Sequence, residues 1–128
     1  MDQDLCARVA DILRRLDAAA LARWGRAPEI IAVSKTVSAP RINEVKAAGI
    51  ARLGENRVQE TLEKLPYLDA AFQIDLIGRL QINKVKYIID KVAMIQSLDR
   101  EPLAQEIDRR AQQHGLRMPV LIQVNIGN

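Results

Sequence analysis

The chain has 128 residues, of which 48% are hydrophobic and only 3% aromatic, and its formal net charge is +3. This length suits one domain with an aliphatic core, and the mild charge and scarce aromatic rings argue against a nucleic-acid-binding protein. The sequence shows no signal peptide and no apolar run near the roughly 18 residues that span a bilayer, and its single cysteine, Cys6, permits no internal disulfide. We therefore expect a soluble, cytoplasmic protein without membrane or nucleic-acid partners.

An amphipathic helix is predicted over residues 4–24, because Leu5, Ile12 and Leu16 recur at helical spacing. The apolar run that follows, at 29–35, is rich in β-branched residues, which is typical of a parallel strand covered on both faces. From there short apolar runs alternate with amphipathic segments. Strands are predicted at 29–35, 50–54, 72–77, 92–96 and 120–125, and helices at 39–48, 56–65, 82–90 and 100–113.

This alternation of strands and helices predicts parallel strands joined by right-handed crossovers. The order fits an open α/β sheet or part of a (β/α)8 barrel. A closed barrel takes about 250 residues, so this chain holds about five of its eight strands. We predict a single partial barrel domain of the (β/α)8 TIM-barrel type over 1–128, with the helix 4–24 placed before the strand–helix units of 29–128.

Polar residues follow several of the predicted strands, and Lys35 follows the first. The carboxyl ends of parallel strands meet at one edge of a sheet or barrel, where active sites lie. A partly desolvated lysine amine at that edge is a nucleophile that condenses with an aldehyde. The plainer alternative is a strand-end lysine that reaches into water. Asn56 and Asp99 are explained equally well as helix N-caps, with Gln59 completing a capping box at Asn56.

Other chemistries find little support in the sequence. His114 is the only histidine, so no metal cluster and no Ser-His-Asp arrangement is predicted, and no glycine fingerprint for nucleotides occurs. Lys84, Lys86 and Lys91 leave open a phosphate-binding patch or a binding module for RNA or another protein, although a solvated helix face explains them more simply.

A family resemblance rests on five motifs. In chain order they are Ala-Val-Ser-Lys-Thr at 32–36, Leu-Gly-Glu-Asn-Arg-Val-Gln-Glu at 53–60, Ile-Gly-Arg-Leu-Gln-Ile-Asn-Lys at 77–84, Gln-Ser-Leu-Asp-Arg at 96–100 and Val-Leu-Ile-Gln-Val-Asn at 120–125. This combination strongly resembles the pyridoxal phosphate homeostasis protein family, the single-domain relatives of the alanine racemase N-terminal barrel. The resemblance extends over residues 28–128.

The resemblance implies a (β/α)8 barrel that holds pyridoxal 5′-phosphate (PLP) as a Schiff base. Lys35 matches the family's cofactor lysine, Asn56 a residue near the cofactor, and Ser97 lies at a matching strand end. It implies a non-catalytic protein that buffers PLP or delivers it to PLP-dependent apoenzymes. The alternative is a PLP-dependent amino-acid racemase of the alanine racemase type, which needs a second acid/base group. In the racemases a tyrosine from a separate β-domain supplies that group, and this chain lacks the domain.

Two departures from the family pattern qualify these expectations. The family has Trp-His-Phe where this chain has Ile74, Asp75 and Leu76, and we expect Asp75 either to repel the cofactor phosphate or to pair with Arg79. Arg57 also stands where the family often has an aromatic residue.

The chain also resembles a family member without its C-terminal half. The family's phosphate-binding segments belong to the last strands, so we expect this chain to bind PLP weakly or not at all. Five strands cannot close a barrel, and the strand edges at 29–35 and 120–125 predict either cover by a partner chain or self-association.

Overall fold

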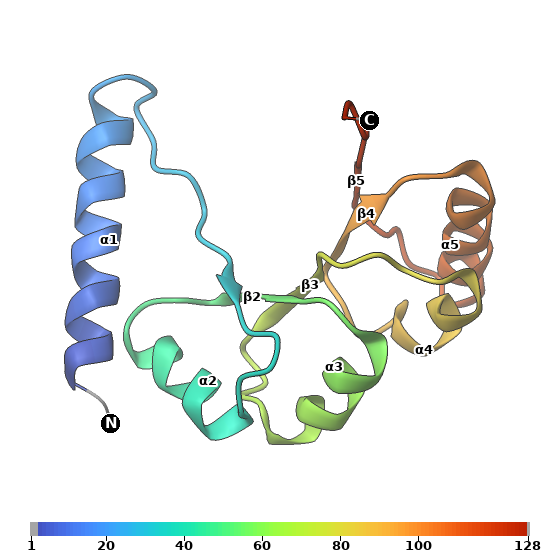
Figure 1. Ribbon diagram of the computed structural model, residues 1–128, viewed down its shortest axis with the longest axis horizontal. Helices are drawn as coiled ribbons and strands as arrows, with labels where there is room; N and C mark the ends of the chain where they lie inside the picture. Colours follow the sequence, from blue (N-terminus) through green and yellow to red (C-terminus); the bar gives the residue numbers. More distant parts are fainter. Residues whose placement is uncertain (1–2, 128) are drawn as a thin grey trace.

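In a computed structural model, which describes residues 3–127, five parallel strands form one sheet in the order β1-β2-β3-β4-β5 (Figure 1). The strands are Ala32–Val33 (β1), Arg52–Glu55 (β2), Gln73–Leu76 (β3), Met94–Leu98 (β4) and Val120–Ile122 (β5). The α-helices are Gln3–Leu21 (α1), Ala39–Ala47 (α2), Val58–Lys64 (α3), Val85–Ile88 (α4) and Glu101–Gln113 (α5), and two 3-10 helices are Leu65–Tyr67 (η1) and Ile82–Lys84 (η2). The predicted α/β fold with five parallel strands is confirmed.

The strand order distinguishes between the two architectures that the sequence left open. A doubly wound sheet reverses its strand order at a switch point, whereas a barrel wall places each strand beside the next one in the chain. Every strand here pairs in parallel with its successor. Figure 1 shows α2, α3, α4 and α5 along the outer side of the curved sheet. This is the arrangement of part of a (β/α)8 barrel wall.

Apolar side chains on the outer face of the strands form the core with the helices. Because strand side chains alternate between faces, Leu53 in β2 and both Ile74 and Leu76 in β3 point toward the helices. Their partners are mainly aliphatic residues of α4 and α5, which are Val85, Ile88, Leu103 and Ile107. The core is almost wholly aliphatic, as the composition predicts.

The inner face of the sheet carries a buried polar cluster instead. Arg52 Nε donates a hydrogen bond to Asp75 Oδ1 over 2.9 Å, and Gln96 Nε2 donates to Asp75 Oδ2 over 2.7 Å. The hydrogen bond to Asp75 raises the pKa of Arg52 above its ordinary value. The expectation that Asp75 pairs with Arg79 is therefore wrong, because its carboxylate is satisfied within the sheet.

The first strand differs most from its prediction. Only two of the residues in 29–35 form β1, and Val33 is 56% exposed, so the expected cover on both faces is wrong for this chain. The physical reason is that β1 is an edge strand with β2 as its only neighbour in the sheet.

Two of the predicted helix caps are also wrong. Helix α3 begins at Val58 with Arg57 in the N-cap position, and Gln59 donates to Glu63 instead of closing a capping box with Asn56. Helix α5 has Arg100 in the N-cap position, and no side-chain cap is made there by Asp99. Both residues are thereby left in the loops that follow β2 and β4.

No helix within residues 3–127 has the length and apolar character that a bilayer crossing requires.

Candidate functional site

The loops that follow the five strands form one rim, because the strands are parallel. A hollow of about 510 Å³ lies on the β5 side of this rim and is lined by Ile77, Arg79, Asp99, Gln123, Val124 and Asn125. A second hollow, of about 570 Å³, is lined by Asn56, Arg57, Val58, Gln59, Arg79, Leu80, Gln81, Lys84 and Arg100. We call the second one the basic hollow. The polar rim predicted from the strand ends is thus present.

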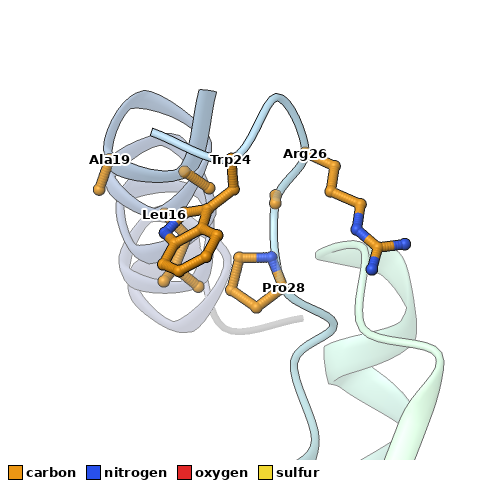
Figure 2. A pocket seen from close by; sticks show the side chains of 7 residues that line it. Leu16, Ala19, Trp24, Arg26 and Pro28 are labelled. Atoms are coloured by element: carbon orange, nitrogen blue, oxygen red, sulfur yellow. The ribbon is translucent and has the colours of Figure 1, made fainter. Parts of the chain in front are cut away.

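A third hollow lies away from this rim, where the end of α1 meets the segment that leads to β1. Figure 2 shows the Trp24 ring beside Leu16 and Pro28, while the Arg26 side chain extends away from them. Its lining offers no nucleophile, acid or metal ligand. Among residues 3–127, no three His, Cys, Asp or Glu side chains gather as a metal site.

Lys35 lies two residues beyond β1 and is exposed. Within residues 3–127 its amine has neither a hydrogen bond nor an ion pair. The predicted shelter of this amine is wrong for this chain, because the edge and inner face of β1 are open. Thr36, the next residue, has a φ of 63°. For a β-branched residue this left-handed conformation is an outlier that costs about 1–3 kcal/mol, and it persists only where the surroundings fix it.

A buried ionic network fixes the residue before Lys35. Ser34 Oγ donates to Glu55 Oε1 over 2.7 Å, and Glu55 is completely buried. Lys64 Nζ donates to the same carboxylate oxygen over 3.0 Å and to the carbonyl oxygen of Ser34 over 2.8 Å. Burial lowers the pKa of Lys64, but its hydrogen bonds to the carboxylates outweigh burial and raise the pKa above its ordinary value. Lys64 is therefore held as an ammonium ion behind the Lys35 turn.

The same network fixes the residue after Lys35. Glu60 Oε1 lies 2.6 Å from Lys64 Nζ and accepts a hydrogen bond from the Thr36 backbone N–H. These hydrogen bonds lower the pKa of Glu60. The larger effect comes from Lys64 and the smaller from the Thr36 backbone. Both neighbours of Lys35 are thus anchored to Lys64 and its two carboxylates, while the Lys35 side chain itself is exposed. Sequence reasoning missed this network, although the four-residue spacing of Glu60 and Lys64 on a predicted helix was a usable signal.

Asn56 reaches the rim as predicted and lines the basic hollow. Its loop is in backbone contact with the loop that follows β3, because Gly78 lies against it. A Cβ atom added to Gly78 would lie 2.5 Å from the Asn56 carbonyl oxygen. Only glycine fits this approach, so Gly78 does more than permit a turn: it brings Asn56 and Arg79 to the same hollow.

Ser97 does not join Lys35 and Asn56 at the surface of the rim. It lies within β4, is fully buried and lines neither rim hollow. Its Oγ finds no hydrogen-bond partner within residues 3–127. A buried hydroxyl group without a hydrogen-bond partner lowers the stability of the fold. Its predicted contact with a cofactor stays a prediction.

The fold and the rim define a barrel-type parallel α/β protein with an exposed lysine just beyond its first strand. The comparison with known proteins is more particular. The chain is 42% identical over 125 residues to the pyridoxal phosphate homeostasis protein of Aquifex aeolicus, and 32% identical over 132 residues to that of Escherichia coli strain K12. These matches cover 95% and 98% of this chain but 55% and 56% of the relatives. The resemblance predicted from the motifs is confirmed, and the chain spans about half the length of the curated relatives it matches.

Solved structures agree with this result. PipY of Synechococcus elongatus without PLP matches with a TM-score of 0.84 at 32% identity, over 96% of this chain and 54% of that one. PipY with PLP bound matches with a TM-score of 0.74 at 34% identity, over 93% and 55%. No family model matches the chain.

Proposed function

We propose that this chain is a PLP-binding protein involved in intracellular PLP homeostasis and that it holds the cofactor as a Schiff base on Lys35. The observation that carries the proposal is the Lys35 turn, in which an exposed lysine at the rim stands between two residues anchored by a buried ionic network. PipY, a relative of similar fold, has been solved with PLP bound. Lys35 would supply the amine, and the cofactor would supply the aldehyde with which that amine condenses, with release of water.

The residues present fit such a ligand in part. Lys35 offers the amine, and Asn56 offers an amide donor and acceptor at the same rim. A dianionic phosphate needs several further donors, which the resemblance assigns to later strands. Because Lys35 is exposed and those donors are not among the described residues, we expect this chain to bind PLP weakly.

Borohydride trapping tests the proposal. The chain is incubated with PLP, reduced, digested and mapped by mass spectrometry. We expect the reduced adduct on the peptide that contains Lys35, and its loss in the Lys35→Arg variant. The matched control is Lys86→Arg, which replaces another exposed lysine and should leave the adduct in place. Equal labelling of all lysines would show that Lys35 has no special role.

We further propose a carrier and not an enzyme, with PLP-dependent apoenzymes as recipients. Racemisation needs acid/base groups on both faces of the substrate carbon. Within residues 3–127, Tyr67 lies in η1, Tyr87 in α4 and His114 at the end of α5, so none of them stands in a loop that follows a strand. We expect no loss of optical activity when L-alanine and PLP are added. Measurable racemisation would contradict this part of the proposal.

The open sheet edges support a proposal about partners. Val33 in β1 is 56% exposed, Ile122 in β5 is 75% exposed, and Val124 just beyond it is 71% exposed. Edge strands with exposed apolar side chains pair readily with other chains. We propose that this chain associates with itself through these edges. Sedimentation velocity should show concentration-dependent species, whereas a single monomeric boundary at all concentrations would rule this out.

A further inference from the structure

The basic hollow has four cationic side chains in its lining and no acidic one: Arg57, Arg79, Lys84 and Arg100. They come from segments that follow three different strands, β2, β3 and β4. Neutral polar groups of Asn56, Gln59 and Gln81 complete the lining. Lys35 is not among the lining residues, although Asn56, which is proposed to meet the cofactor beside Lys35, is one of them.

The hollow is held in shape by backbone contacts and not only by flexible side chains. Gly78 presses its loop against the backbone of Asn56, which fixes Arg57 and Arg79 on adjoining loops. Arg100 Nη2 donates to the carbonyl oxygen of Leu80 over 2.6 Å, so this guanidinium bridges two of the segments. The backbone of the site and the Arg100 side chain are therefore in place before any ligand arrives, which reduces the ordering that binding requires.

The cations in the hollow are only partly neutralised by protein acids. Asp99 pairs with Arg100. Glu60 interacts electrostatically with Arg57, but its carboxylate is already bonded to Lys64 and to a backbone amide. Arg79 forms no ion pair in the described part of the chain. Like charges gathered around one hollow repel each other, and a bound anion relieves that repulsion.

We propose that the basic hollow binds a phosphomonoester dianion, at a position distinct from the Lys35 Schiff base. Arginine guanidinium groups match the geometry of phosphate oxygens with paired, charge-assisted hydrogen bonds, and a dianion with three free oxygens can engage several of them together. A singly charged carboxylate satisfies fewer of these donors.

A nucleic-acid backbone fits the surroundings less well. Single-stranded nucleic acid requires a basic groove with aromatic platforms, and no aromatic ring lines the hollow. Of Lys84, Lys86 and Lys91, Lys84 alone is in the lining, and its amine stands 6.0 Å from the centre of the Tyr87 ring. Lys91 pairs with Asp90 over 2.9 Å, and Lys86 stands 5.0 Å from the centre of the Tyr87 ring. The charges converge on one hollow and do not form a stripe.

A titration with methyl phosphate, monitored by amide NMR of the whole chain, tests the proposal. We expect saturable shifts of the Asn56, Gln59 and Gln81 signals. Arg57→Gln and Arg79→Gln should each weaken binding about tenfold, the effect of losing one charge-assisted hydrogen bond. The control Lys86→Gln removes the same charge outside the hollow and should leave the affinity unchanged. Acetate should bind at least about tenfold more weakly than methyl phosphate, because it carries one charge less.

Several results would overturn the proposal. The first is the absence of saturable binding, and the second is binding of acetate as tight as that of methyl phosphate. The third is a loss of affinity in Lys86→Gln equal to that in the arginine variants, which would indicate a nonspecific electrostatic attraction. Tighter binding of an oligonucleotide that depends on Lys86 would favour a nucleic-acid surface instead. Methyl phosphate should still bind after PLP has been fixed on Lys35 by reduction, and its exclusion would mean that the two sites are one. Because methyl phosphate has no aldehyde, its binding can succeed even if the Schiff-base proposal fails.

Discussion

Replacing Lys64 by methionine tests the network behind the Lys35 turn most directly. Methionine keeps an unbranched side chain of similar length but removes the ammonium group that bonds Glu55, Glu60 and the Ser34 carbonyl. Glu55 is completely buried, and its Oε2 has no hydrogen-bond partner within residues 3–127. Its Oε1 accepts hydrogen bonds from Ser34 and Lys64, and of these two donors only Lys64 carries a compensating charge. Breaking a buried ion pair from one side costs about 3–5 kcal/mol, because the other charge is left uncompensated.

That loss is large beside the total stability of a small domain, which is about 5–15 kcal/mol. We expect Lys64→Met to lower the free energy of unfolding by about 3–5 kcal/mol in urea titrations followed by far-ultraviolet circular dichroism. The double variant Glu55→Gln, Lys64→Met removes both charges and should be more stable than the single variant. The exposed pair of Lys91 and Asp90 provides the control, since Lys91→Met should cost less than about 1 kcal/mol.

The reasoning would be refuted by a change of less than about 1 kcal/mol in Lys64→Met, which is the range of an exposed pair. A second readout concerns the site itself. Loss of the network should free the Thr36 backbone from its left-handed conformation, and amide NMR should show this as a shift of the Thr36 signal. Lys64→Arg, which retains a cation, should restore part of both effects.

The remaining predictions concern pH and one glycine. Because hydrogen bonds, first from Lys64, lower the folded-state pKa of Glu60, its contribution to stability is complete above the ordinary carboxyl value of 4.5 and is lost as pH falls through the lowered value. Urea midpoints measured between about pH 3 and pH 7 should therefore fall less steeply on the acid side in Glu60→Gln. Gly78→Ala forces a Cβ atom against the Asn56 carbonyl and should cost about 1–3 kcal/mol while shifting the NMR signals of the basic hollow. Gly115→Ala, at a φ of 63° in open space, should cost about 1 kcal/mol and leave those signals unchanged.

The order of strands and helices could be predicted because apolar periodicity is a local property of the sequence. Lys35 and Asn56 could be placed at one edge for a related reason, since parallel strands always share their carboxyl ends. The predictions of N-caps at Asn56 and Asp99 were wrong, because each helix begins a residue or two later than predicted. The preference of a residue type for the N-cap position is weak compared with the constraints of the tertiary structure. The exposure of Lys35 could not be foreseen either, because it depends on what covers β1 and not on the residues around it.

Contacts between distant segments were the second source of error. Glu55 lies in β2 and Lys64 in α3, and their residue types alone do not show that they form an ion pair next to Ser34. The same is true of Gly78, whose requirement for glycine comes from the Asn56 backbone. Asp75 was expected to repel the cofactor phosphate or to pair with Arg79, yet the alternation of β3 places it beside Arg52 on the inner face. In each case the deciding partner lies on another strand or helix.

The strand order β1-β2-β3-β4-β5 has a consequence for how this chain is made. Each strand finds its partner in the segment synthesised just before it, so every crossover closes a short loop and long-range searching is avoided. The wall can grow one unit at a time as the polypeptide leaves the ribosome, with each helix settling on a sheet that already exists. During synthesis the growing edge is then always the newest strand, and it stays available for the next one.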